Sequence, residues 1–390
     1  MSRLNIAVAG MVAGDPGQGG ATWAVLQYVL GLRRLGHNVT LVEAMADRSV
    51  VPTGSAFTRS TNARYFSDVV RQFGLTGDAG IVHVETRQTV GLSLHALADR
   101  LSRCDLVLNI AGNLREIPEL FETTPLRLYL DLDPAFTQLW NADGIDMRWA
   151  GHTHYATVGL RLADSTTDLP LGGIDWFVTL PPVVLDIWRA APQGRHVHNP
   201  SLGAYTTVAN WRSYGSIERN GRIYGQKVHS WRALMELPLR TGLAFTPAIS
   251  IHPDEVADLE RLKLGGWQVL PAEKSVATPD AYMAFIRDSR AEIGIAKSGY
   301  VLSRCGWFSE RSACYLAAGR PVLAQETGFA GVLPVGEGLL SFSTLDDAIE
   351  GVRAIEADYV RHAGIARELA GDYFDSARVL SKLLAHVSAA

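Results

Sequence analysis

The stretch LNIAVAGMVAGDPGQGGATWAVLQYVLGLRRLGHNVTLVE, residues 4–43, decides the fold class. Its first seven residues alternate small and apolar side chains, which predicts a buried strand. A glycine-rich loop follows, and residues 22–36 place apolar side chains at helical spacing up to Gly36, a residue typical of a helix C-cap. Because residues 37–43 are again strand-like, the stretch predicts a βαβ unit and therefore a parallel sheet with a right-handed crossover.

The alternation of strands and helices continues through both halves of the chain. In the first half, further strands are predicted at residues 104–112, 126–133 and 154–160. A second series begins after a connector and domain boundary at residues 175–204, which contains the Pro181-Pro182 pair followed by further Pro, Gly and His residues. It comprises a strand at 204–211, a polar glycine-bearing loop at 212–226, a helix that starts at Lys227 and ends before Pro238, a strand at 242–252 and a helix at 253–266.

This order predicts an α/β protein with two Rossmann-like domains in tandem. We place the domains at residues 1–185 and 200–370, with a terminal helix at 371–390.

Composition limits the class of function. The chain has 390 residues, of which 47% are hydrophobic and 19% charged, so a large core is available. The net charge of -4 gives no support for nucleic acid as a partner. Three cysteines, far from CxxC spacing, predict neither a disulfide framework nor a zinc site. No uncharged apolar run reaches the roughly 18 residues of a membrane span, and no signal peptide opens the chain, so we expect a cytoplasmic protein and leave peripheral membrane contact open.

The segment GWFSERSACYLAAGRPVLAQETGF, residues 306–329, has the features of a ligand site. Ser309 is a good helix N-cap and Ser312 lies in the first turn, so free N–H groups and hydroxyls point the same way. A diphosphate binds where such N–H groups are joined by one or two cations. Small side chains then let the helix approach a sheet or a ligand: Ala313, Ala317, Ala318 and Gly319.

The end of that segment suggests sugar recognition. Gln325 and Glu326 close a short strand and can bond sugar hydroxyls, while Gly328 lets the backbone approach a ligand.

Two such domains facing across a cleft resemble the GT-B glycosyltransferases, and three motifs support the resemblance. The loop around Gly17, Gly19 and Gly20, together with LRRLGHNVTLVE, looks like the acceptor-domain opening of many such enzymes. The pattern ANWR…GQKVHSWRAL looks like the first turn of their donor domain, which implies that Arg212 and Lys227 hold the nucleotide diphosphate. SERSACYLAAGRPVLAQETGF looks like their nucleotide-sugar segment. The resemblance covers most of the chain at the level of pattern.

The sequence departs from the family at two positions. Retaining members usually have a glutamate where Cys314 stands, which binds the nucleotide ribose, and an earlier glutamate near Gly306. Glu310, one turn before Cys314, is an alternative ribose contact. The ribose ligand and the stereochemical outcome therefore stay open.

Several other residues are candidates with an ordinary structural alternative beside each. Asp131 and Asp133 in LDLDP end a strand, where we expect a base or an acceptor contact rather than a metal site. His152 and His154 lie two apart without an obvious third metal ligand, so His152 is predicted as an acceptor-activating base. His252, which ends a strand, is a candidate donor ligand.

Lys297, in AKSGY, is a candidate partner for a phosphate charge. The loop GDPGQGGA has neither GxGxxG nor P-loop spacing, so Gly17, Gly19 and Gly20 are assigned to the acceptor side or to turn geometry.

The sequence thus predicts a metal-independent, cofactor-free glycosyltransferase that moves a hexosyl-type sugar from a nucleoside diphosphate sugar to an unidentified acceptor hydroxyl. The C-terminal domain would bind the donor and the N-terminal domain the acceptor. Two alternatives remain: a nucleotide-sugar epimerase of the same architecture, and a non-catalytic nucleotide-sugar-binding protein.

Overall fold

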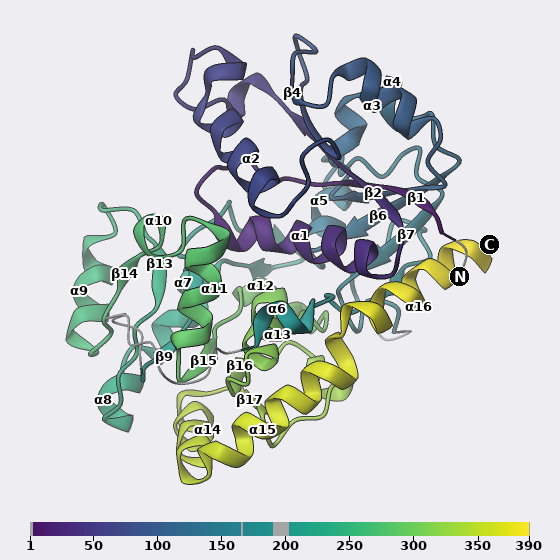
Figure 1. The fold of residues 1–390 in the computed structure, drawn as a ribbon. Coiled ribbons are helices and arrows are strands. Elements are labelled where there is room, and N and C mark those ends of the chain that lie inside the picture. Colours follow the sequence, from purple (N-terminus) through teal and green to yellow (C-terminus); the bar gives the residue numbers. More distant parts are fainter. Residues whose placement is uncertain (1–2, 165–166, 190–202, 390) are drawn as a thin grey trace.

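A computed structural model describes residues 3–164, 167–189 and 203–389, which form two α/β domains (Figure 1). Of the predicted connector at 175–204, residues 190–202 lie outside the described residues, and the described part contains the strand Phe177–Val178 and the helix Leu185–Trp188. No helix within the described ranges is both long enough and apolar enough to cross a membrane.

The N-terminal domain is built on one eight-stranded sheet, in the order β4-β3-β2-β1-β5-β6-β7-β8. All neighbouring strands are parallel except β3 and β4. Its strands are β1 (Asn5–Ala9), β2 (Asn38–Met45), β3 (Ala79–His83), β4 (Thr89–Gly91), β5 (Leu106–Ile110), β6 (Leu126–Asp131), β7 (His154–Thr157) and β8 (Phe177–Val178). Its helices are α1 (Gly19–Arg34), α2 (Thr61–Gln72), α3 (Leu94–Leu101), α4 (Pro118–Phe121) and α5 (Phe136–Ala142), and the short helix α6 (Leu185–Trp188) follows its last strand. The parallel pairing of β1 with β2 around α1 confirms the predicted βαβ unit.

The C-terminal domain contains two small parallel sheets, β10-β13-β14 and β17-β16-β15-β9, and the antiparallel hairpin β11–β12. Its strands are β9 (Tyr205–Thr206), β10 (Val208–Asn210), β11 (Ile217–Arg219), β12 (Arg222–Tyr224), β13 (Ala248–Ser250), β14 (Leu270–Pro271), β15 (Ala291–Gly294), β16 (Val322–Gln325) and β17 (Leu339–Phe342). Its helices are α7 (Lys227–Trp231), α8 (Leu237–Thr241), α9 (Val256–Leu264), α10 (Ala272–Ser275), α11 (Pro279–Asp288), α12 (Ser298–Ser303), α13 (Glu310–Ala317), α14 (Leu345–Ala357) and α15 (Tyr359–Leu369). The last helix is α16 (Ser376–Ala389).

Two local predictions in this domain are wrong. The strand expected at 204–211 is two strands, β9 and β10, that join different sheets. The loop expected at 212–226 contains the hairpin β11–β12, because Asn220 and Gly221 both adopt the left-handed backbone conformation that a two-residue hairpin turn requires. The helix that starts at Lys227 does end before Pro238, as predicted, and Pro238 itself lies in the first turn of a further helix, α8, where its missing N–H costs nothing.

The two domains contact each other at two places, both beyond the carboxyl ends of parallel strands of the N-terminal sheet. On one side, the start of α1 packs so closely that a Cβ on Gly19 would lie 2.4 Å from the Thr278 carbonyl oxygen. On the other side, the chain after β7 forms a main-chain bridge with the chain before α13, in which the Arg161 N–H donates to the Cys305 carbonyl at 3.1 Å. Helix α16 returns from the C-terminal domain and packs on α1 (Figure 1).

Candidate functional site

A cavity of about 310 Å³ lies between the domains, where the glycine-rich loop, the end of β6 and the start of α13 meet. Seven of the sequence candidates line it: Gly19, Gly20, Asp133, Lys227, Lys297, Ser309 and Glu310. Two larger hollows, of about 440 and 530 Å³, contain none of the candidates. The interdomain cavity is therefore the candidate site.

Lys227, the first residue of α7, is the most unusual charge in this cavity. It is only 8% exposed, and its ammonium donates to the Ile295 carbonyl at 2.6 Å. The nitrogen lies 5.3 Å from the centre of the Trp307 ring, and no carboxylate among the described residues forms an ion pair with it. Burial, and then the nearby Arg311, hold the pKa of Lys227 well below its usual value. An ammonium with unused donors therefore borders the cavity.

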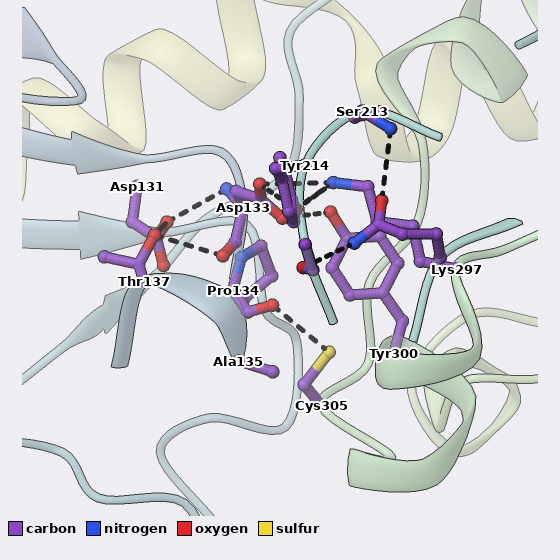
Figure 2. Close-up of polar contacts among 12 residues, drawn as sticks. Asp131, Asp133, Pro134, Ala135, Thr137, Ser213, Tyr214, Lys297, Tyr300 and Cys305 are labelled. Atoms are coloured by element: carbon purple, nitrogen blue, oxygen red, sulfur yellow. Dashed lines mark hydrogen bonds and ion pairs between the residues drawn. The ribbon is translucent and has the colours of Figure 1, made fainter. Parts of the chain in front are cut away.

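Lys297 sits in a polar cluster that joins the two domains (Figure 2). Its ammonium lies 3.3 and 3.2 Å from the two carboxylate oxygens of Asp133, which follows β6 in the N-terminal domain. Tyr214 donates to Asp133 Oδ2 at 2.5 Å, and Tyr300 donates to Asp133 Oδ1. Burial lowers the pKa of Lys297, and the Asp133 charge partly offsets this.

Aromatic rings surround the Lys297 ammonium. Its nitrogen lies 4.1 Å from the ring centre of Tyr214, 5.1 Å from that of Tyr300 and 5.0 Å from that of Phe136. Burial followed by the Asp133 charge raises the pKa of both tyrosines, so both remain hydroxyl donors at neutral pH. The rings fix the lysine beside the cavity, since a cation over an aromatic face is stabilised by the ring quadrupole.

The N-terminus of α13 supplies the third cation. Ser309 caps the helix as predicted, accepting the Arg311 N–H at 3.2 Å. The Arg311 guanidinium is buried, forms an ion pair with Glu292 and donates to the Val208 carbonyl at 2.9 Å. Both Ser309 and Arg311 line the cavity.

Asp131 and His152 do not line the cavity, and their surroundings are structural. Asp131 is fully buried and accepts hydrogen bonds from Thr137, Gln138 and Thr157, so it orders the turn that carries Asp133. His152 is held between Asn109 Nδ2 at 2.9 Å and the Trp149 carbonyl at 3.0 Å. Burial lowers its pKa to about 4. Neither residue has the access to a substrate that a general base needs, so we correct both assignments.

Two predicted donor ligands also lie away from the cavity. The Arg212 side chain is 45% exposed and pairs with Glu255, which directs its guanidinium elsewhere. The His252 side chain is 72% exposed and faces Asp254. Both are surface groups, and we correct their assignment accordingly.

The remaining predicted positions build the backbone around α13 and β16 rather than the cavity wall. The Ser312 side chain is buried, and Gln325 accepts the Ala296 N–H at 3.2 Å. Glu326 accepts the Gly328 N–H, and a Cβ on Gly328 would lie 2.6 Å from the Arg304 carbonyl. The positions that we correct in this way are Ser312, Gln325, Glu326 and Gly328. Gly17, before α1, does not line the cavity and has a φ of 89°, which fits the turn geometry given as one of its two alternatives.

The structure explains one of the two missing glutamates and locates the position of the other. Gly306 has a φ of 76°, and a Cβ there would lie 2.7 Å from the Arg161 nitrogen, so no side chain fits. The Cys314 thiol is buried 3.5 Å from Gln27 Nε2. Neither position borders the cavity.

Sequence reasoning missed Tyr214 and Arg311. Arg311 lies two residues after the predicted N-cap Ser309, and this position indicates a cation at the start of the helix. A further signal was the rarity of lysine, since the chain has five lysines among 36 basic residues. Two of these five, Lys227 and Lys297, lie in the cavity.

The described residues contain no group of three or more His, Cys, Asp and Glu side chains that could hold a metal ion. No protein-family model matches the sequence, and no curated protein is significantly similar to it in sequence.

Comparison with solved structures gives matches over the whole chain. An α-glucosyltransferase solved with UDP and a 13-mer DNA has a TM-score of 0.62 at 11% identity, covering 99% of this chain and 100% of that one. The Anabaena protein HepE, solved with UDP and glucose, has a TM-score of 0.61 at 10% identity and covers both chains fully. A glycosyltransferase from Rickettsia africae has a TM-score of 0.55 at 12% identity, covering 99% and 98%. The predicted architecture is confirmed: the chain has the GT-B fold, with two Rossmann-like domains and C-terminal helices.

Proposed function

We propose that this protein is a glycosyltransferase that takes its sugar from a nucleoside diphosphate sugar bound in the interdomain cavity. The observation that supports this is the convergence of three buried cations, Lys227, Lys297 and Arg311, on one cavity beside a capped helix N-terminus. Buried cations are costly unless an anion accompanies them. Lys227 forms no ion pair within the described ranges, so a diphosphate would supply the missing charge.

UDP is the first nucleotide to test, because two of the structural neighbours were solved with it. In our proposal the C-terminal domain supplies the donor contacts, since Lys227, Lys297 and Arg311 all belong to it. The glycine-rich loop and Asp133, from the N-terminal domain, face the acceptor. Stabilisation of the leaving diphosphate by these cations removes the need for a metal ion.

Asp133 is the proposed general base. It is the carboxylate that the N-terminal domain contributes to the cavity wall. Its ion pair with Lys297 neutralises both charges before the reaction. The acceptor hydroxyl would transfer its proton to Asp133 as its oxygen bonds to the anomeric carbon. The bond from that carbon to the diphosphate breaks, and the diphosphate leaves with the electron pair. Protonation of Asp133 frees the Lys297 charge for the leaving group, so proton transfer and leaving-group stabilisation support each other.

The acceptor remains to be identified by experiment. The α-glucosyltransferase neighbour was solved with DNA, so the net charge of -4 does not by itself remove nucleic acid from the acceptors to be tested.

The test is a donor screen that measures nucleotide release with and without acceptors, each in the presence and absence of EDTA. Release of UDP that depends on an acceptor and is unaffected by EDTA supports the proposal. Interconversion of the donor sugar without an acceptor would identify an epimerase, and donor binding without turnover would identify a binding protein. Absence of binding by any nucleotide at millimolar concentration refutes the donor site.

A further inference from the structure

We propose that Glu43 is a positioning residue: its carboxylate fills the anion-binding nest at the start of the glycine-rich loop and sets that loop as a preformed wall of the cavity. The catalytic effect of this loop rests on the proposed transferase function, whereas the nest itself is a feature of the geometry.

The geometry of the nest is simple. Glu43 lies in β2 and is fully buried. Its Oε2 accepts the N–H groups of Val12 at 2.9 Å and Ala13 at 2.8 Å, and its Oε1 accepts the N–H of Gly14 at 2.6 Å. Consecutive N–H groups that converge on one point form a concave anion site, which in other proteins holds phosphate. Here the chain's own carboxylate occupies it.

This occupancy separates the loop from a phosphate-binding loop. While Glu43 is in place, a substrate phosphate cannot use these three N–H groups. A Cβ on Gly14 would lie 3.0 Å from Glu43 Oε1, so the approach itself requires a small residue. The donor diphosphate is therefore left to the cations of the C-terminal domain.

Other bonds hold the same loop, so its position depends on a small set of contacts. Asn62 Nδ2 donates to the Ala13 carbonyl at 2.7 Å, and the Thr22 hydroxyl lies 3.3 Å from the Val12 carbonyl. Further along, the Gly19 N–H donates to the Val276 carbonyl of the other domain at 3.2 Å. Gln18, which ends the loop, and Gly19 and Gly20, which begin α1, line the cavity.

Glu43 is unlike the buried carboxylate Glu292, which is paired with Arg311. Within the described residues no Lys, Arg or His forms an ion pair with Glu43, so the three N–H groups are its stabilising partners. Burial raises its pKa to about 7, so the experiments belong at pH 8, where it is ionised. Because burying a carboxylate costs free energy, its role here is to hold the three backbone N–H groups that it accepts.

The experiment is chemical rescue. Glu43→Ala leaves the nest empty, and formate or acetate should enter it, whereas chloride at equal ionic strength and the bulkier pivalate should not act. We expect Glu43→Ala to lower kcat/KM by roughly 100-fold, the effect of a small misplacement of a binding element. Formate should restore part of that loss in a saturable manner. Glu43→Gln, which has the same shape but lacks the negative charge, should lose activity without rescue.

A matched control is Asp258→Ala, which removes a buried carboxylate that pairs with Arg232 in the C-terminal domain, away from the cavity. It should lower stability without producing formate-dependent kinetics. Amide hydrogen exchange at residues 12–14 is the second readout, and it is informative even if no donor is ever turned over. Exchange there should be faster in Glu43→Gln and should slow again when formate is added to Glu43→Ala. Unchanged exchange in both variants, or wild-type kcat and KM in a folded Glu43→Ala, would overturn the inference.

Discussion

Lys227→Met separates a role in ligand binding from a role in folding. We expect the substitution to maintain or raise the stability of the ligand-free protein but to lower its affinity for UDP. Methionine matches the length of lysine but lacks its charge. The ammonium is buried, and its pKa is lowered, which means that the folded protein disfavours the protonated form. Removing it relieves that cost, leaves the Ile295 carbonyl without its partner, a loss of about 1 kcal/mol, and removes the cation above the Trp307 ring. The ligand-free variant should therefore melt at the same temperature as the wild type or higher.

Binding of UDP should weaken sharply in the same variant. Two unit charges about 4 Å apart interact by roughly 4 kcal/mol at the effective dielectric constant typical of such sites. Because part of the diphosphate faces solvent, we expect about 2–3 kcal/mol, which corresponds to a Kd for UDP raised roughly 30- to 150-fold. Isothermal titration calorimetry measures the Kd, and a thermal melt measures stability.

The matched control is Lys263→Met, an exposed lysine of α9 outside the cavity. It should change neither quantity. Wild-type affinity for UDP in Lys227→Met would refute the assignment of this lysine to the diphosphate. A clearly lower melting temperature of the ligand-free variant would show that the lysine supports the fold instead.

Three further predictions test other parts of the structure. His152, with a pKa of about 4, stays neutral in the folded protein while the unfolded chain takes up a proton below about pH 6.5. Its contribution to stability should therefore be complete above pH 6.5 and fall by up to about 3 kcal/mol toward pH 4, and urea unfolding of His152→Asn should show a weaker acid dependence. Gly306→Ala should destabilise the protein by about 1–3 kcal/mol, because its Cβ meets the Arg161 nitrogen; thermal unfolding at wild-type level would contradict the bridge geometry. Asp133→Asn should tighten UDP binding, since Lys297 loses its internal competitor, while kcat falls roughly 100-fold or more; weaker UDP binding would refute that competition.

The sequence predicted the parts of the fold that depend on neighbouring residues. Strand β1, helix α1 and strand β2 follow from local periodicity, and the structure places them within a few residues of the expected limits. The hairpin β11–β12 was equally local, and the Asn-Gly pair at its turn signals it; the surrounding polar residues obscured that signal. The capping of α13 by Ser309 was predicted correctly for the same reason, because an N-cap acts within one turn.

The site was less predictable because it is assembled from distant positions. Asp133 and Lys297 are 164 residues apart, and only the packing of the two domains brings their side chains together. Arg212 shows the converse. Its place after a strand suggested a ligand role, but a nearby carboxylate, Glu255, takes its guanidinium. Lysine is usually exposed, and the residues that neighbour Lys227 in the sequence do not indicate that it is buried.

The absence of the two glutamates limits which carboxylates could contact a sugar at the proposed donor site. At Gly306 the main-chain bridge between the domains requires a glycine, so no carboxylate can occupy this position. The cavity wall then contains two carboxylates, Asp133 and Glu310. Asp133 is occupied by Lys297, whereas Glu310 forms no ion pair within the described ranges and accepts one long hydrogen bond, from the Ser309 hydroxyl at 3.4 Å. Glu310 therefore has the free acceptor capacity that the hydroxyls of a ribose or a donor sugar need. It lies at the first position of α13, one turn before Cys314, and it remains the predicted ribose contact.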